Sequence, residues 1–154
     1  TETDMSNPLS VTSLLKKEAS TRWVEHPTVP GMRFNIRFVS KQQVRNLSNS
    51  CTVLRFNSAE KKRVPELDTE RLVRQLCERA VVGWEGVTPR RLTKLIQVDF
   101  SAVPKESLDV EIAFDIEQCA VLFANAYDMD LWLQDVCTDV SSFNPSSEEL
   151  EKNS

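Results

Sequence analysis

The stretch RAVVGWEGVTPRRLTKL, residues 79–95, is the most informative part of this 154-residue sequence. An apolar helical stripe leads into it, and the glycines on either side of Trp84 are expected to end that helix. Thr88 is a strong start signal for the next helix, because threonine caps a helix N-terminus and the proline after it suits the first turn. The stretch therefore predicts helices over residues 68–83 and 89–96. The indole of Trp84 is expected to pack between them.

A β-hairpin is predicted upstream, over residues 22–39. Its second half alternates apolar residues with polar and basic ones, in the order Met32, Arg33, Phe34, Asn35, Ile36, Arg37 and Phe38. This period of two is typical of a strand with one buried face and one wet, basic face. The prolines in the connection place the first strand at an edge of the sheet. His26 lies in this turn-rich connection, where we expect it to face solvent.

Three further helices are predicted over residues 40–55, 116–126 and 129–141, from apolar residues that recur at spacings of three and four. Ser40 and Gln43 have the spacing of a capping box at the start of the first of these helices. Two reciprocal hydrogen bonds would then satisfy backbone groups at that helix end, which strengthens the prediction of a helix start there.

Two carboxylates are candidate N-caps for the last two helices, Asp115 and Asp128. Large apolar residues recur at every second position at Val110, Ile112 and Phe114, so an extended segment is expected before the first of these caps. Residues 51–56 are favoured as the end of the helix predicted over residues 40–55, although a strand fits them as well. Residues 57–65 contain a run of three basic residues and are expected to form an exposed loop.

These elements predict a single α+β domain over residues 21–143, in which an N-terminal β-hairpin packs against about five helices. Residues 1–20 are expected to form a flexible arm or a short helix capped by Ser10. Residues 144–154 form a polar, acidic tail that we expect to be disordered. No apolar run approaches the length of about 20 residues that crosses a bilayer, so no membrane contact is predicted.

Charge is distributed unevenly along the chain. Residues 1–100 carry 17 lysines and arginines against 11 aspartates and glutamates, whereas residues 101–154 carry 2 against 12. This asymmetry suits head-to-tail association, in which a basic surface of one copy contacts an acidic surface of the next. The residues that we propose for such a partner or self-assembly surface are Arg33, Arg37, Arg90, Arg91, Lys94, Asp128, Asp135 and Asp139. Oligomers held in this way should shrink as salt rises.

The sequence contains no recognisable catalytic, metal-binding or cofactor-binding motif. His26 is the only histidine and has no local partner for acid–base catalysis. The cysteines form no CxxC pair and are expected to be buried free thiols, at Cys51, Cys77, Cys119 and Cys137. The three glycines, Gly31, Gly83 and Gly86, do not have the spacing of a phosphate-cradling glycine loop. We therefore expect a protein that is not an enzyme and that uses no metal or cofactor.

The three tryptophans are expected to be structural anchors, at Trp23, Trp84 and Trp132. Large aromatic side chains in a chain with few of them usually lie in the core. Tryptophan is also enriched at binding hot spots, so an interface role for one of the three stays open.

Several segments, in order, resemble the tail assembly chaperones of long-tailed bacteriophages and prophages. The most recognisable of them is VGWEGV, residues 82–87. The other segments that carry the resemblance are residues 23–27, 33–39, 40–43, 90–98, 111–115, 143 and 148–153. The resemblance rests on the order and spacing of these segments, which together span most of the chain.

The resemblance implies a non-enzymatic chaperone that binds the long, hydrophobic, helical tape measure protein and keeps it soluble. It further implies that the chaperone helps to recruit the tail tube protein and is absent from the mature virion. The expected location is the cytoplasm of the bacterial host. Some members of this family self-associate into rings or spirals, so a homo-oligomer is expected, and many exist in a short and a frameshifted longer form.

Other functions stay open at the level of the sequence. One is a generic protein-interaction domain. Another is a nucleic-acid-binding adaptor that uses the basic hairpin and Arg90 with Arg91, although the acidic pI of about 5.1 makes nucleic acid an unfavourable partner. An enzyme would need a nucleophile such as a cysteine with a depressed pKa.

Overall fold

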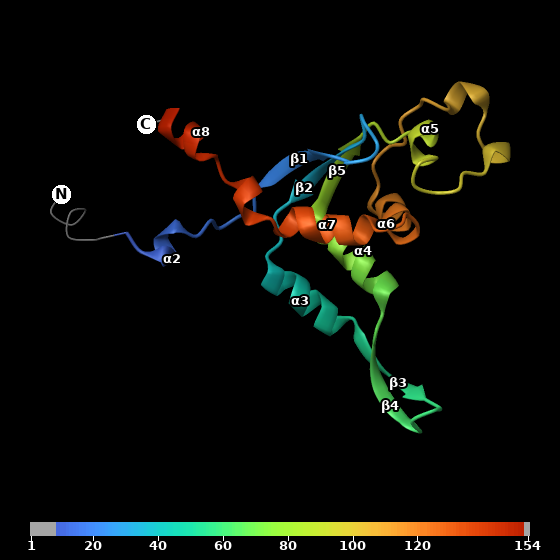
Figure 1. Ribbon diagram of the computed structural model, residues 1–154, viewed down its shortest axis with the longest axis horizontal. Coiled ribbons are helices and arrows are strands. Elements are labelled where there is room, and N and C mark those ends of the chain that lie inside the picture. The colour runs from blue at the N-terminus through green and yellow to red at the C-terminus, as the bar shows by residue number, and fades with distance from the viewer. Residues whose placement is uncertain (1–8, 153–154) are drawn as a thin grey trace.

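A three-stranded antiparallel sheet lies at the centre of the α+β fold, and helices pack against one of its faces (Figure 1). This computed structural model describes residues 9–152, so the ends of the predicted N-terminal arm and acidic tail lie outside the described residues. The strand order is β1-β2-β5, and both pairings are antiparallel. The predicted hairpin and the edge position of its first strand are therefore confirmed.

The helices and strands have the following bounds: α2 Val11–Leu14, β1 Thr21–Glu25, β2 Arg33–Arg37, α3 Lys41–Ser50, β3 Thr52–Asn57, β4 Lys62–Leu67, α4 Thr69–Ala80, β5 Val81–Glu85, α5 Pro89–Leu92, α6 Ile116–Asn125, α7 Met129–Thr138 and α8 Ser147–Lys152. Three short 3-10 helices lie at Phe100–Ala102, Lys105–Ser107 and Val140–Phe143.

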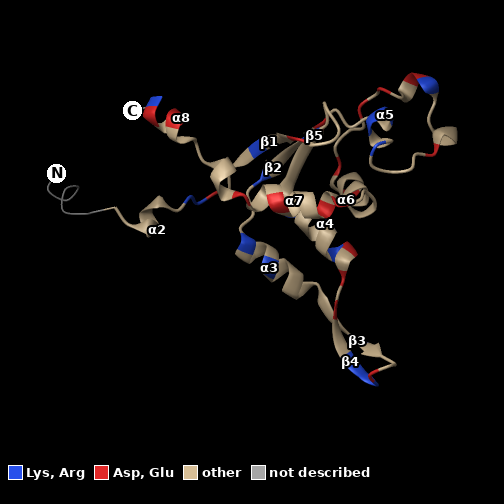
Figure 2. Cartoon of the chain, in the orientation of Figure 1, with Lys and Arg blue, Asp and Glu red and all other residues tan. Residues whose placement is uncertain are grey.

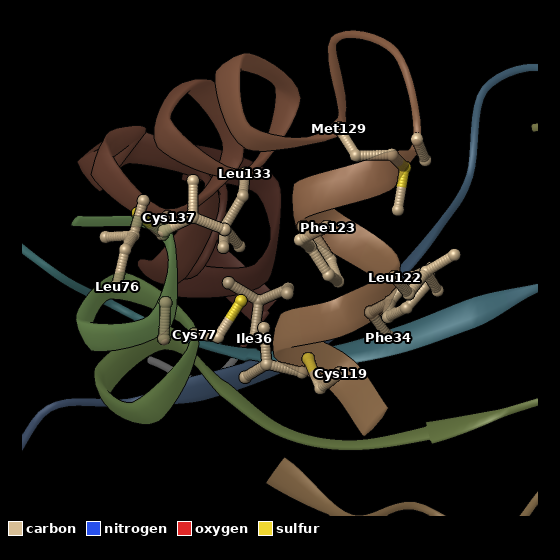
Figure 3. Packing of buried hydrophobic residues seen from close by; sticks show 14 of the residues in the cluster. Phe34, Ile36, Leu76, Cys77, Cys119, Leu122, Phe123, Met129, Leu133 and Cys137 are labelled. Carbon is tan, nitrogen blue, oxygen red and sulfur yellow. The ribbon is translucent and has the colours of Figure 1, made fainter. Parts of the chain in front are cut away.

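The core lies between the sheet and helices α4, α6 and α7 (Figure 3). Phe34 of the central strand is fully buried, and its ring meets three others edge-on or nearly so. The ring centroids lie 6.1 Å from Trp84, 5.5 Å from Phe123 and 5.5 Å from Trp132. Edge-to-face contacts of this kind add to the free energy of burying apolar area. The alternation predicted for this strand is thus confirmed, because Phe34 and Ile36 are buried while Arg37 is exposed.

The predicted end of the helix over residues 68–83 is wrong. The helix ends at Ala80, and the next residues form strand β5 beside β2, with Trp84 opposite Phe34. Two β-branched valines and a glycine disfavour further helix, while pairing with the central strand satisfies the backbone. The first glycine of the Gly-Trp-Glu-Gly segment therefore lies inside a strand, and only Gly86, at φ +73, turns the chain.

The exposed loop predicted over residues 57–65 is also wrong. Helix α3 ends at Ser50 rather than near residue 55, and β3 and β4 then form a second hairpin. Strand is thus the correct choice between the two structures that fit residues 51–56. Asn57 makes the reversal compact, because its side-chain oxygen accepts from the N–H groups of Ala59 and Glu60 at 2.9 and 3.1 Å.

Most predicted helix starts are confirmed. Ser40 and Gln43 form the reciprocal capping box, and the Thr88 and Asp115 side chains accept backbone hydrogen bonds at their helices. Asp128 is the exception, because its side chain makes no cap bond. Its backbone lies in the left-handed region at φ +58, where it reverses the chain between α6 and α7.

Several predicted helices are shorter in the structure. The α5 helix is a single turn that ends at Leu92, and α7 ends at Thr138 before a 3-10 turn. Ser10 caps α2 as predicted, but that helix ends at Leu14. The tail is not disordered throughout, because Ser147–Lys152 forms helix α8. Between residues 9 and 152, no helix combines the length and the apolar character that crossing a membrane requires.

Candidate functional site

An apolar groove of about 570 Å³ lies between the α5 region, the segment around residue 112 and helix α6. Its apolar lining consists of Trp84, Val87, Leu92, Leu95, Ile96, Ile112, Val121, Leu122 and Tyr127. Polar lining comes from the amides Gln97, Gln118 and Asn125, and no charged side chain lines the groove. A mostly apolar groove with amides among its lining suits the apolar face of a helix or another hydrophobic segment.

Two apolar residues of the lining are largely exposed. Val121 on α6 is 56% exposed, and Tyr127 beyond the end of α6 is 88% exposed. Their apolar surface is available to a partner, whereas Val87 and Leu122 belong to the buried core. A ligand in the groove would therefore contact both exposed side chains and the edge of the core.

The extended segment before α6 forms one wall of the groove because it is hydrogen-bonded to β5 and to the two residues after it. The indole Nε1 of Trp84 donates to the carbonyl of Ile112 at 2.7 Å, and the N–H of Ile112 donates to the carbonyl of Val87 at 2.8 Å. The N–H of Gly86 also donates to the Glu111 carboxylate. These bonds satisfy backbone groups that a covered wall would otherwise leave unpaired.

Two glycines bring the β1–β2 connection against the start of α5. Gly31 and Gly86 both have positive φ, at +87 and +73. A Cβ at Gly86 would lie 1.9 Å from the carbonyl oxygen of Gly31, and one at Gly31 would lie 2.6 Å from Nη2 of Arg91. Positive φ favours glycine at both positions, and at Gly86 the backbone of Gly31 also leaves no room for a Cβ.

The arginines predicted for a partner surface already have partners inside the chain. Arg33 pairs with Glu85, and Arg90 makes a bidentate pair with Asp109 at 2.8 and 3.2 Å. The Arg90 hydrogen bond lowers the pKa of the Asp109 carboxyl. Arg91 donates to the carbonyl of Gly86, and Arg37 donates to the carbonyl of Arg79.

The remaining predicted surface residues lie in two places. Lys94 and Asp128 line one hollow of about 320 Å³ together with Trp132. Asp135 and Asp139 line a separate hollow near the end of α7. Hydrogen bonds from Ser142 and Ser141 lower the pKa of the Asp139 carboxyl. The structure thus brings Lys94 to Asp128 but does not gather the predicted residues into one surface.

His26 is buried, at 7% exposure, so the prediction that it faces solvent is wrong. Its Nδ1 accepts from the N–H of Thr28 at 3.2 Å, and its Nε2 lies 3.1 Å from the sulfur of Met129. The ring also contacts Trp132, with centroids 5.3 Å apart. Burial lowers the pKa of this imidazole. The histidine therefore links the hairpin connection to α7 as a packed, neutral side chain.

The tryptophans differ in their surroundings. Trp84 is buried, and Trp132 packs partly buried against the core. Trp23 is 42% exposed on the outer face of the sheet, where the Arg33 guanidinium lies 5.2 Å from its ring centroid. Trp84 and Trp132 thus lie in or against the core, whereas Trp23 is a surface residue.

All four cysteines are buried free thiols, as predicted. A hydrogen bond with Cys77 and burial raise the pKa of Cys119, and burial raises the pKa of Cys137 to about 12. Both groups are protonated thiols at neutral pH, whereas a nucleophilic cysteine requires the opposite shift. Within residues 9–152, no group of three or more histidine, cysteine, aspartate or glutamate side chains has the arrangement of a metal site.

The sequence did not single out the groove. Three of its lining residues, Leu92, Leu95 and Ile96, lie within the helix predicted over residues 89–96 and form a short apolar face there. Comparisons with protein families, with characterised proteins and with solved structures found no match to this chain.

Proposed function

We propose that this chain is a non-enzymatic tail assembly chaperone whose groove binds an apolar helical segment of the tape measure protein. The groove between α5 and α6 is the observation that carries the proposal, because it offers apolar surface to a partner without a charged lining. The sequence resemblance supplies the identity of the partner. On this proposal the protein acts in the cytoplasm of the bacterial host, helps to recruit the tail tube protein, and is absent from the mature virion.

The chemistry of the groove supports a hydrophobic protein segment as its ligand. Helix-in-groove recognition places the apolar residues of one helix face into a hydrophobic channel. Here the exposed side chains of Val121 and Tyr127 would contact such a face, while Gln97 and Gln118 could bond polar groups at its edge. Covering the apolar face of a long helical protein removes the surface through which it would aggregate.

A nucleic-acid adaptor draws less support from the same residues. The guanidinium groups of Arg33 and Arg90 already contact carboxylates, and Arg37 and Arg91 donate to backbone carbonyls. Phosphate binding would need these groups to exchange partners. A protein ligand in the groove requires no such exchange.

The decisive experiment is co-expression with the long, helix-rich protein encoded downstream in the same genome. We expect that protein to stay soluble and to co-purify with this chain. Val121→Glu should abolish both effects, because it places a charge on the exposed wall of the groove. Val140→Glu is the matched control, since Val121 and Val140 are equally exposed at 56% and Val140 lies outside the groove.

Co-purification that both variants retain would place the binding surface elsewhere and contradict the groove. Precipitation of the downstream protein despite good expression of this chain would contradict the chaperone function itself. Circular dichroism of both variants checks that the fold is intact, which is expected because both substitutions lie on the surface.

A further inference from the structure

The β3–β4 hairpin forms a sheet of its own and projects away from the body of the molecule (Figure 1). Its strands, Thr52–Asn57 and Lys62–Leu67, pair along their whole length. An isolated two-stranded hairpin is marginally stable in water unless a further strand or a packed face supports it. A further surface packed against this hairpin would therefore stabilise it.

The two faces of the hairpin differ. On one face, Arg55 pairs with Glu66 at 3.0 Å beside the half-buried Val53 and Val64. The opposite face is apolar and exposed, and its members are Leu54, Phe56, Pro65 and Leu67. Phe56 alone is 67% exposed. Apolar side chains gathered on one side of a projecting element indicate a contact surface.

Pro65 restricts how this surface can be used. It lacks the N–H that would donate to an added strand, so extension of the sheet at β4 is disfavoured. The contact is therefore expected to form through the apolar face rather than along the edge of β4.

The charge of the hairpin defines its partner further. Arg63 lies directly opposite Phe56 on the apolar face, and Lys61 and Lys62 follow at the tip. Figure 2 shows this basic tip at the far end of the projection. Within residues 9–152, none of these three side chains forms an ion pair. A complementary surface should combine exposed apolar side chains with unpaired carboxylates.

The corner between α6 and α7 has this composition. A hollow of about 470 Å³ is lined there by the carboxylates Glu70, Asp128 and Asp130, with no lysine or arginine in its lining. Tyr127 and Leu131 line the same hollow and are exposed. We call the surface formed by these five residues the acidic corner.

The tip of the hairpin lies away from the acidic corner of its own chain. Its strands of six residues extend about 20 Å from their base, and they point away from α6 and α7 (Figure 1). We propose that the apolar face of the hairpin docks on the acidic corner of a second copy of this chain. Hairpin and corner are different surfaces, so the contact is heterologous and each copy can bind one neighbour on either side.

Self-association is measured on the purified chain alone, so its test is separate from that of the chaperone function, although Tyr127 belongs to both the groove and the acidic corner. Sedimentation velocity over a range of protein concentrations should show reversible assembly that weakens as salt rises from about 0.1 to 1 M. Phe56→Ser combined with Arg63→Glu should weaken assembly at least about tenfold. Leu131→Ser combined with Asp130→Lys should have the same effect from the other side of the contact.

A matched control uses the same residue types outside both surfaces. Phe100→Ser combined with Lys105→Glu changes a phenylalanine that is 57% exposed and a lysine in the neighbouring 3-10 turn. This variant should assemble like the unmodified chain. All the substituted side chains are exposed except Asp130, which is half-buried in the first turn of α7. Circular dichroism and thermal unfolding of all three variants check that the fold is retained.

Mixing the two interface variants gives the sharpest test. The hairpin variant retains an intact acidic corner, and the corner variant retains an intact hairpin. A heterologous contact predicts that the mixture forms a dimer with one of each chain and assembles no further. The proposal is overturned if the unmodified chain stays monomeric, if either interface variant assembles normally, or if the mixture stays monomeric.

Discussion

The strands of the central sheet and of the β3–β4 hairpin share an alternating sequence pattern, but their apolar residues lie in opposite environments. Phe34 in β2 is buried among three aromatic rings, whereas Phe56 in β3 is 67% exposed. Both belong to strands in which apolar residues alternate with polar ones. The sheet has α4, α6 and α7 packed against it, while the hairpin has no helix against either face in the described chain. Alternation therefore defines a face, and the rest of the fold decides whether that face is covered.

The largest expected effect separates these two phenylalanines. Phe34→Ala should lower the free energy of unfolding by about 3–5 kcal/mol, because it removes a buried ring and leaves a cavity. Phe56→Ala should change it by less than about 0.5 kcal/mol, since the ring is exposed in the single chain. Urea unfolding at low protein concentration measures both. Equal effects would mean that the hairpin is part of the packed body.

A smaller effect is expected from the glycines around Trp84. Gly86→Ala should cost about 2–4 kcal/mol, because the residue has positive φ and the new Cβ would overlap the carbonyl of Gly31. Gly83→Ala is the matched control, since no atom lies within 4 Å of its added Cβ. That variant should change stability by less than about 1 kcal/mol. Thermal unfolding of the pair tests whether the loop contact, rather than strand β5 itself, requires glycine.

The next effect depends on pH and concerns His26, which packs the β1–β2 connection against α7. Burial lowers the pKa of His26 below its ordinary value of 6.5, so the folded state favours the neutral ring. The unfolded chain then binds more protons, and stability falls as pH drops through that value towards the folded pKa. Above the ordinary pKa the contribution is fully present.

Urea midpoints of the unmodified chain and of His26→Gln, measured from about pH 7.5 down to about pH 5, isolate this contribution. The unmodified chain should lose more stability over this range than the variant. Parallel curves for the two proteins would show that the imidazole does not cause the pH dependence.

The smallest effects are expected from surface ion pairs. Double-mutant cycles on Arg55 with Glu66 in the hairpin, and on Arg74 with Glu117 between α4 and α6, should each give less than about 1 kcal/mol. All four side chains are substantially exposed, so solvent screens both pairs. A much larger coupling energy between Arg55 and Glu66 would contradict the view that apolar contacts, rather than ion pairs, determine how each region is packed.

Local signals predicted much of the fold. The hairpin of β1 and β2 follows from alternation, and the starts of α3, α5 and α6 follow from side-chain caps at Ser40, Thr88 and Asp115. These features depend on residues within a few positions of one another. The α+β class follows from them as well.

Contacts between distant residues account for the errors. Strand β5 exists because Trp84 pairs with Phe34, and a single-sequence pattern favoured continued helix there. His26 is buried because α7, about a hundred residues later, brings Met129 and Trp132 against it. The groove likewise needs α5, α6 and the segment around Ile112 together, so only part of its lining carried a signal in the sequence.

The four buried thiols have a practical consequence for studying this protein. A maleimide dye reacts with an accessible thiolate, and none of the native cysteines offers one in the folded chain. A single replacement, Ala59→Cys in the exposed turn of the hairpin, would therefore accept one fluorophore without removal of the native residues. The folded chain is ready for site-specific labelling, and energy transfer between labelled copies could follow assembly as it happens.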